Sequence, residues 1–262
     1  MRSNLFETME PRQMLTGVTL TPDQTLHIDG SAGGDRIVVE NARGKLNVLL
    51  ITPKKTYAYR LKPTLVKRLV IGSGRGNDII NVTASTLRSA VIATAAGDDA
   101  VYAHGNALLI DGGDGNDRIT TINNTGAGTN NLVGGNGSDR LNARGGMNHL
   151  DGGTGNDILY HAGNTPVFDT PLSKESPASL ARSMVEANRS YDSRANLVGG
   201  SGNDLFYAAS DDKIIGGKGR DHMLLQADIP GLRRPVHRLD AQADVFSRVD
   251  AHGVEIAQIS LY

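Results

Sequence analysis

The chain has 262 residues, with 27 Lys or Arg against 28 Asp or Glu, no Cys and no Trp. Its net charge of −1 excludes strong electrostatic attraction to nucleic acid as a main function. The sequence contains no run of about 18 apolar residues, so no membrane span is predicted. The lack of cysteine is compatible with an oxidising compartment and equally with a reducing one. The length allows one elongated domain or two compact ones.

Residues 1–17 lack the apolar central region of an ordinary secretory signal. Residues 6–16 nevertheless read Phe-Glu-Thr-Met-Glu-Pro-Arg-Gln-Met-Leu-Thr, which resembles the bacterial N-terminal sorting motif F-E-x-L-E-P-R-x-L-L-S. The segment departs from that motif by Met9, Met14 and Thr16. The resemblance implies an exported bacterial protein, secreted or at the cell surface. The alternative is an unstructured N-terminus that matches by chance.

Residues 18–71 alternate between apolar and polar residues in short runs, as β-strands with one buried face do. We expect strands near residues 18–20, 26–28, 37–39, 46–51 and 69–71, with a turn at residues 53–55. The first coil of a stacked structure must be shielded from pairing with other chains. Residues 18–71 are therefore predicted to form an N-terminal β cap.

A six-residue motif, Gly-Gly-x-Gly-x-Asp, occurs five times without a mismatch. The perfect copies are residues 112–117, 134–139, 152–157, 199–204 and 216–221, and looser copies are residues 30–35, 73–78 and 94–99. Neighbouring copies end 17 to 22 residues apart, except across two gaps of 43 and 47 residues. Such a period indicates one structural unit that is repeated in a stack.

Apolar residues recur at fixed places around this motif. Two places after the Asp stand Ile37, Ile80, Val101, Ile119, Leu141, Leu159, Phe206 and Met223, and just before the perfect copies stand Ile110, Leu132, Leu150, Leu197 and Ile214. Because glycine tolerates the positive φ of abrupt corners, each coil is predicted to run strand, corner, strand, corner. Successive coils then pair in parallel about 4.8 Å apart. The expected fold over residues 72–225 is an all-β parallel β-helix solenoid.

The second corner of each coil lacks the acidic motif. It is expected near residues 104–107, 123–130, 144–148 and 209–212. The period is broken over residues 162–193, where Ser176 and Pro177 predict the start of a short amphipathic helix. We expect a helical insertion there, looped out of one coil, and a C-terminal cap in residues 226–262.

The repeat places Asp117, Asp139 and Asp157 in one row, one strand spacing apart. Two unit charges at about 4.8 Å repel by roughly 1 kcal/mol in water and roughly 3 to 4 kcal/mol at an effective dielectric constant of 20. Such a row needs a counter-charge, or the pKa values of its carboxyl groups rise. Ca²⁺ takes six to eight oxygen ligands in flexible geometry and suits glycine-rich corners better than Mg²⁺, which requires a tight octahedron.

There is an alternative without metal. Asp side chains often cap backbone N–H groups in turns. In addition, Arg36, Arg118 and Arg140 each follow a motif Asp directly and offer a compensating charge.

The nonapeptide Gly-Gly-x-Gly-x-Asp-x-apolar-x resembles the repeat of the RTX, or hemolysin-type, calcium-binding proteins, over about residues 72–225. The resemblance implies a right-handed parallel β-roll with Ca²⁺ between successive corners. It also implies ligands from the Asp carboxylate and from the carbonyls of the first Gly and the third residue. In this sequence the resemblance implies as ligands the carboxylates of Asp117, Asp139, Asp157 and Asp204. It also implies the carbonyls of Gly112, Asp114, Gly134, Asn136, Gly152, Thr154, Gly199 and Ser201.

The chain departs from the family pattern in carrying the nonapeptide once per coil instead of about every nine residues. We therefore expect ions along one edge only. Arg75, Lys218 and Arg220 stand inside their corners and oppose a divalent ion there. The strongest sites are expected between the corners that end at residues 117, 139 and 157.

These features favour a calcium-binding, non-enzymatic structural or adhesive protein that is exported and has cell-surface or matrix components as partners. The competing hypothesis is a polysaccharide-acting enzyme, lyase- or epimerase-like, built on a β-helix. Neither a His-Glu-x-x-His nor a Gly-x-Ser-x-Gly motif is present. Candidate acid–base residues gather only around the insertion: His161, Asp169, Arg182, Arg189 and Asp192.

Overall fold

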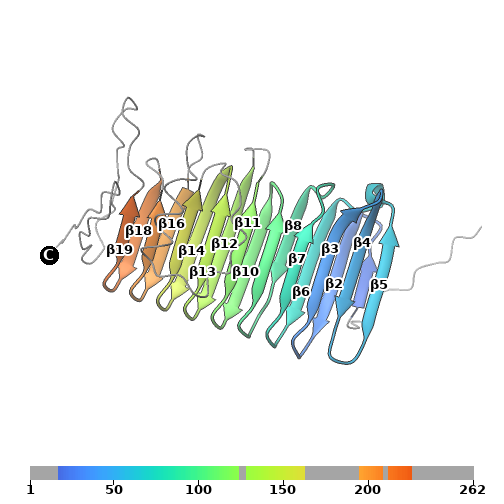
Figure 1. Cartoon of the computed structure of the whole chain (residues 1–262), viewed down its shortest axis with the longest axis horizontal. Coiled ribbons are helices and arrows are strands. Elements are labelled where there is room, and N and C mark those ends of the chain that lie inside the picture. Colours follow the sequence, from blue (N-terminus) through green and yellow to red (C-terminus); the bar gives the residue numbers. More distant parts are fainter. Residues whose placement is uncertain (1–16, 124–127, 163–194, 209–211, 226–262) are drawn as a thin grey trace, which may run out of the picture.

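The computed structural model describes residues 17–123, 128–162, 195–208 and 212–225. These residues form nineteen strands and one turn of 3₁₀ helix, η1 (Pro63–Leu65). The strands belong to two sheets, and Figure 1 shows them side by side as rungs along the long axis of the molecule.

The two sheets have the following orders. The nine-stranded sheet runs β1 (Gly17–Leu20), β2 (Thr25–Ser31), β6 (Arg68–Gly74), β8 (Ser89–Ala93), β10 (Leu108–Asp114), β12 (Thr129–Asn136), β14 (Met147–Thr154), β16 (Ala195–Ser201) and β18 (Lys213–Lys218). The ten-stranded sheet runs β19 (His222–Leu225), β17 (Leu205–Ala208), β15 (Ile158–Ala162), β13 (Arg140–Arg144), β11 (Arg118–Ile122), β9 (Ala100–His104), β7 (Ile79–Thr83), β3 (Arg36–Ala42), β4 (Lys45–Ile51) and β5 (Thr56–Leu61).

From β6 onwards, consecutive strands alternate between the two sheets, and each strand pairs in parallel with the strand one coil away. Each coil thus gives one strand to each sheet, as a parallel solenoid requires. The predicted all-β parallel architecture is confirmed. The two corners of each coil fall where the glycine motif and the second-corner segments predict them.

The strands expected in residues 18–71 are present as β1, β2, β3, β4 and β6. Strand β5 was not among them, although Tyr57, Tyr59 and Leu61 alternate as strand residues do. Parallel stacking begins within this segment, because β2 pairs with β6 and β3 pairs with β7. The antiparallel strands β1, β4 and β5 flank this first coil. The division into a cap and a roll at residue 72 stays a prediction.

One apolar core runs through the stack. Two of its rows lie in register, one from each sheet, at the positions around the motif that the sequence predicts. The nine-stranded sheet contributes Ile28, Ile71, Ile92, Ile110, Leu132, Leu150, Leu197 and Ile214, and the ten-stranded sheet contributes Ile37, Ile80, Val101, Ile119, Leu141, Leu159 and Phe206. All are buried, and further rows, such as Leu69 and Ala90 in one sheet and Val82 and Ala103 in the other, complete a core that only stacking can form.

The stack continues in register across residues 163–194. Strand β16 pairs with β14 and β17 pairs with β15, so the coil of Asp204 lies directly on the coil of Asp157. The predicted helix, the sorting motif and the C-terminal cap lie outside the described residues. Among the described residues, no helix has the length and apolar character needed to cross a membrane.

Candidate metal centre

Each glycine motif links a strand of the nine-stranded sheet to the next strand of the ten-stranded sheet. The corners stack so tightly that side chains are excluded at several positions. Gly137, for example, has φ of +132°, and a Cβ placed on it would overlap the carbonyl oxygen of Gly115 in the preceding coil. Glycine is required there by its backbone conformation and by the close approach of the neighbouring coil.

The motif aspartates form a continuous ladder along this edge. The backbone N–H of Asp117 donates to Oδ1 of Asp139, that of Asp139 to Asp157, and that of Asp157 to Asp204, each at 2.8 Å. The N–H of Asp204 donates in turn to Oδ1 of Asp221 at 3.0 Å. All five side chains are at most 2% exposed. The carboxylates therefore cap backbone N–H groups, as the metal-free alternative predicts. Each one accepts the N–H of a neighbouring coil, and it does so with Oδ1 only.

The second carboxylate oxygen is unused in the four predicted ligands. Oδ2 of Asp117, Asp139, Asp157 and Asp204 is buried and accepts no hydrogen bond within the described part of the chain. A buried acceptor without a donor is costly, and a buried charge without a partner more so.

The first glycine of each perfect repeat lies directly against this oxygen, and a side chain there would overlap it. A Cβ on Gly112 would meet Oδ2 of Asp117, and it would lie 2.6 Å from the carbonyl oxygen of Gly134 in the next coil. Gly134 and Gly199 show the same arrangement with the carbonyls of the next coil at 2.6 and 2.5 Å. At these three glycines two oxygens from neighbouring coils thus approach the same point, and neither brings a proton.

Burial dominates the electrostatics of the row. It raises the pKa of Asp117 and of Asp157 to about 7, and repulsion from neighbouring carboxylates adds to the effect. Burial likewise raises the pKa of Asp139 and of Asp204 to about 6, while a hydrogen bond from a backbone N–H of the preceding coil opposes the rise. Burial thus disfavours the ionised form of each of these groups relative to an exposed Asp, and a bound cation would favour it.

The predicted carbonyl ligands of the third position lie in a row beside the aspartates. The carbonyls of Asp114, Asn136, Thr154 and Ser201 each accept an N–H from the fourth-position glycine of the preceding coil, at 2.6 to 2.8 Å. Because a carbonyl oxygen has two lone pairs, each keeps one for a further partner.

A second ladder, which sequence reasoning missed, runs through the fifth position of the motif. The N–H of Asn116 donates to Asp98 Oδ1 at 2.8 Å, Ser138 N–H to Asn116 Oδ1 at 2.9 Å, and Asn203 N–H to Asn156 Oδ1 at 2.7 Å. In this ladder the accepting side chain belongs to the coil before the donor, whereas in the aspartate ladder it belongs to the coil after the donor. The recurrence of Asn at this position was the available signal.

Two of the three arginines that follow a motif Asp, Arg36 and Arg140, do not neutralise the row. Arg36 and Arg140 point away from the core on the outer face of the ten-stranded sheet, and neither has an ion pair with a carboxylate in the described part of the chain. Arg75, Lys218 and Arg220 are exposed at their corners. The metal-free alternative therefore lacks its expected counter-charge at Asp139.

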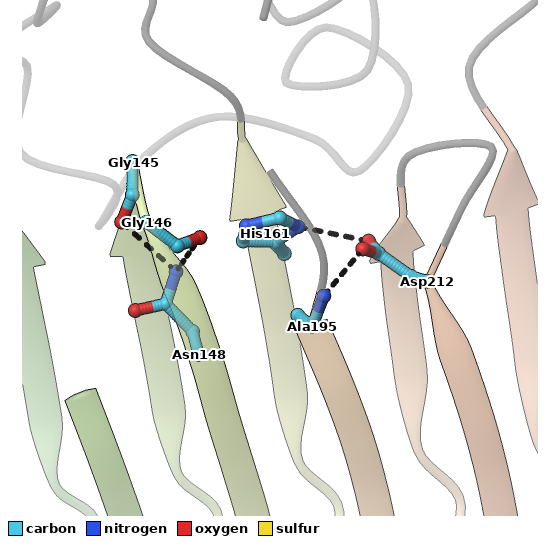
Figure 2. A network of polar contacts seen from close by, with 6 residues as sticks. All are labelled: Gly145, Gly146, Asn148, His161, Ala195 and Asp212. Carbon is cyan, nitrogen blue, oxygen red and sulfur yellow. Dashed lines mark hydrogen bonds and ion pairs between the residues drawn. The ribbon is translucent and has the colours of Figure 1, made fainter. Parts of the chain in front are cut away.

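The opposite edge carries a different polar network, shown in Figure 2. His161 at the end of β15 is 2% exposed, and its Nδ1 lies 2.9 Å from Oδ2 of the buried Asp212. Oδ1 of Asp212 accepts the N–H of Ala195 at 2.8 Å. In the neighbouring coil, Nδ2 of Asn148 donates to the carbonyls of Gly145 and Gly146 at 3.2 and 3.3 Å. Asp212 thus ties the strand before residues 163–194 to the strand after them.

The donor set of the glycine-rich edge fits a hard cation. The described residues hold no group of three or more His, Cys, Asp or Glu side chains placed to bind one ion together. An ion at this edge would instead take one carboxylate per corner and several main-chain oxygens. All these ligands are oxygens, which Ca²⁺ prefers.

The glycine-rich coils match a family model described as "RTX calcium-binding nonapeptide repeat (4 copies)". The match covers residues 109–121, 124–159 and 194–223, and it leaves out the three looser copies. No curated protein and no solved structure matches the chain. The predicted repeat type is confirmed, and the repeats are of a calcium-binding kind.

Proposed function

From these calcium-binding RTX repeats, we propose that the chain holds a row of Ca²⁺ ions along one edge of the roll. The ligands are the carboxylates of Asp117, Asp139, Asp157 and Asp204. The carbonyls of the first and third motif residues complete them: Gly112, Asp114, Gly134, Asn136, Gly152, Thr154, Gly199 and Ser201. The observation that carries the proposal is the buried Oδ2 atom in each of the four aspartates, which accepts no hydrogen bond in the described part of the chain.

Ion binding in this arrangement is coupled to folding. At Gly112, Gly134 and Gly199 the carboxylate and carbonyl oxygens come together only when two coils are stacked, because one oxygen comes from each coil. An ion that binds there stabilises the stacked state relative to separated coils. The role is therefore that of a calcium-dependent structural protein.

We further propose that the protein acts outside the cytoplasm, as a structural or adhesive component that contacts cell-surface or matrix material. The resemblance of residues 6–16 to a bacterial sorting motif supports export. Calcium sites of extracellular modules bind at about 10⁻⁴ to 10⁻³ M, which suits folding after export.

The polysaccharide-acting alternative gains no support. His161, one of its five candidate residues, is buried and paired with Asp212. The other four candidates lie outside the described residues.

Calorimetric titration of calcium-free protein tests the proposal. We expect Ca²⁺ to bind with a defined stoichiometry and Mg²⁺ to bind much more weakly. A triple variant, Asp117→Asn, Asp139→Asn and Asp157→Asn, should lose most of this binding. Asp151→Asn is the matched control, because Asp151 precedes a glycine pair but lies on the outer face of the sheet. Equal binding by the triple variant and the wild type would refute the proposal.

A further inference from the structure

The aspartate ladder continues beyond the coils that match the family model. The backbone N–H of Asp78 donates to Oδ1 of Asp99 at 2.7 Å, and that of Asp99 donates to Oδ1 of Asp117 at 2.8 Å. Oδ1 of Asp78 in turn accepts the N–H of Asp35 at 2.7 Å. The looser corners that end at Asp78 and Asp99 therefore stack in the same row as the perfect ones.

Asp78 and Asp99 also share the unused oxygen of the four proposed ligands. Oδ2 of each is buried and accepts no hydrogen bond within the described part of the chain. The two residues are 1% and 2% exposed. Arg75, in the corner of Asp78, is exposed and has no ion pair with a carboxylate among the described residues. A buried carboxylate oxygen without a donor or counter-charge is costly, and a cation beside it would offset that cost.

The main chain of these corners is arranged like that of the perfect repeats. The N–H of Gly76 donates to the carbonyl of Ala96 at 2.7 Å, and the N–H of Gly97 donates to the carbonyl of Asp114 at 2.8 Å. Gly76 and Gly97 have φ of +104° and +140°, close to the +134° of Gly115 in the first perfect copy. The carbonyl of Ala96 thus stands at the third position of its motif and keeps a lone pair for a further partner.

Ser73 and Thr94 stand where the perfect repeats have their first glycine. Oγ1 of Thr94 donates to the carbonyl of Gly112 in the next coil at 2.5 Å, and Oγ of Ser73 lies 3.4 Å from the carbonyl of Thr94. A hydroxyl group has one proton and two lone pairs, so a hydroxyl that donates to a carbonyl remains an acceptor. The hydroxyl residues therefore add oxygen atoms to these corners, and Oδ2 of each aspartate stays without a donor in the described part of the chain.

Asp35, at the next corner towards the N-terminus, differs in this respect. The backbone N–H of Ser31 donates to its Oδ2 at 2.5 Å, and Oγ of Ser31 donates to its Oδ1 at 2.8 Å. Both carboxylate oxygens of Asp35 therefore have a donor from their own corner. This side chain is also buried, so burial alone does not distinguish it from Asp78 and Asp99.

We infer that Asp78 and Asp99 are further calcium ligands, so that the row of ions begins at Asp78 and not at Asp117. Each carboxylate binds Ca²⁺ through Oδ2, together with main-chain oxygens of its corner. Asp35 binds none, because the protein itself satisfies both of its oxygens. This inference rests on the proposed function, and it extends the calcium sites to two coils that the family model leaves out.

Counting the bound ions in single variants tests the inference. The number of Ca²⁺ ions per chain is measured by calorimetry and by metal analysis after dialysis. We expect at least one ion fewer for Asp78→Asn and for Asp99→Asn than for the wild type. Asp35→Asn is the matched control, and it should keep the wild-type number. A wild-type number in either of the first two variants would overturn the assignment of that aspartate.

Amide hydrogen exchange in the wild type gives a second test, which holds even if a variant does not fold. We expect Ca²⁺ to slow exchange in β6 to β9 as well as in β10 to β17. Slowing that is confined to β10 and the strands after it would overturn this inference and leave the proposed function standing. If Ca²⁺ neither binds nor changes exchange in any strand, the proposed function fails, and this inference fails with it.

Discussion

At the scale of single residues, the two oxygens of each motif aspartate have different tasks. Oδ1 joins the coils whether or not an ion is present, since it accepts a backbone N–H of the preceding coil. Oδ2 has no such partner in the four predicted ligands. In the proposed sites the charge of each aspartate therefore serves to bind the ion, and the hydrogen bond to Oδ1 serves to hold neighbouring coils together.

Replacing Asp139 by Asn separates these tasks. The amide keeps an acceptor for the Asp117 N–H and directs an NH₂ group towards the Gly152 carbonyl. Because a buried charge is removed, we expect the calcium-free variant to be at least as stable as the wild type. In saturating Ca²⁺ it should be less stable than the wild type by several degrees in Tm. Thermal unfolding in both buffers measures this, and an equal gain from Ca²⁺ in both proteins would contradict it.

A second residue-scale prediction concerns the glycines. Gly137→Ala should destabilise the roll by about 3 to 5 kcal/mol, because strain at positive φ adds to overlap with the preceding coil. Gly44→Ala is the matched control: Gly44 has φ of +70° with nothing within 4 Å of its Cβ position, so only about 1 kcal/mol is expected. Denaturant unfolding gives both values. Similar losses in the two variants would show that close stacking of the coils is unimportant.

At the scale of elements, β16 follows β15 in the chain only after residues 163–194, so the two strands are far apart in sequence. Closing a long loop costs entropy that grows slowly with its length. Asp212 offsets part of this cost, because it contacts His161 before the gap and Ala195 after it (Figure 2). A contact at the edge opposite the glycine-rich corners thus helps to hold the coils before and after residues 163–194 together.

His161→Leu should therefore loosen the coils that follow the gap. Removing the partner of a buried charged group costs about 1.5 to 3 kcal/mol. We expect faster amide hydrogen exchange in β16 to β19, with exchange in β10 to β13 little changed. His149→Leu, on the outer face of β14, is the control. Adding Asp212→Asn to His161→Leu should recover part of the protection, and unchanged exchange in His161→Leu would argue against this contact.

The elements themselves follow closely from the sequence, because a repeated motif fixes both corners and the inward-facing residues. Ile110 and Leu132, for instance, are buried in register where the spacing predicts them. The partners of single side chains do not follow in this way. Asp212 and His161 are 51 residues apart, and no periodicity links them. The fifth-position ladder was missed because Asn in a turn has many local uses.

At the scale of the whole molecule, the proposed calcium sites would make protons and Ca²⁺ compete for the same buried carboxyl groups. The pKa values of Asp117 and Asp157 are about 7, and those of Asp78, Asp139 and Asp204 about 6, in the folded protein. In the unfolded chain an Asp has a pKa near 3.9. The folded state therefore binds protons more tightly than the unfolded state. The stability that this contributes is complete below about pH 4 and is lost as the pH rises through 6 to 7.

Calcium-free protein should consequently unfold at progressively lower temperature between about pH 4.5 and pH 7.5. Ca²⁺ binds the deprotonated carboxylates, so the gain in Tm from added Ca²⁺ should grow over the same range. Thermal unfolding at each pH, with and without Ca²⁺, gives both curves. An Asp117→Asn, Asp157→Asn double variant removes the two aspartates whose pKa is raised to about 7, so its calcium-free curve should be flatter. Calcium-free wild type that is more stable at pH 7.5 than at pH 5 would mean that the buried row is already neutralised by the protein itself.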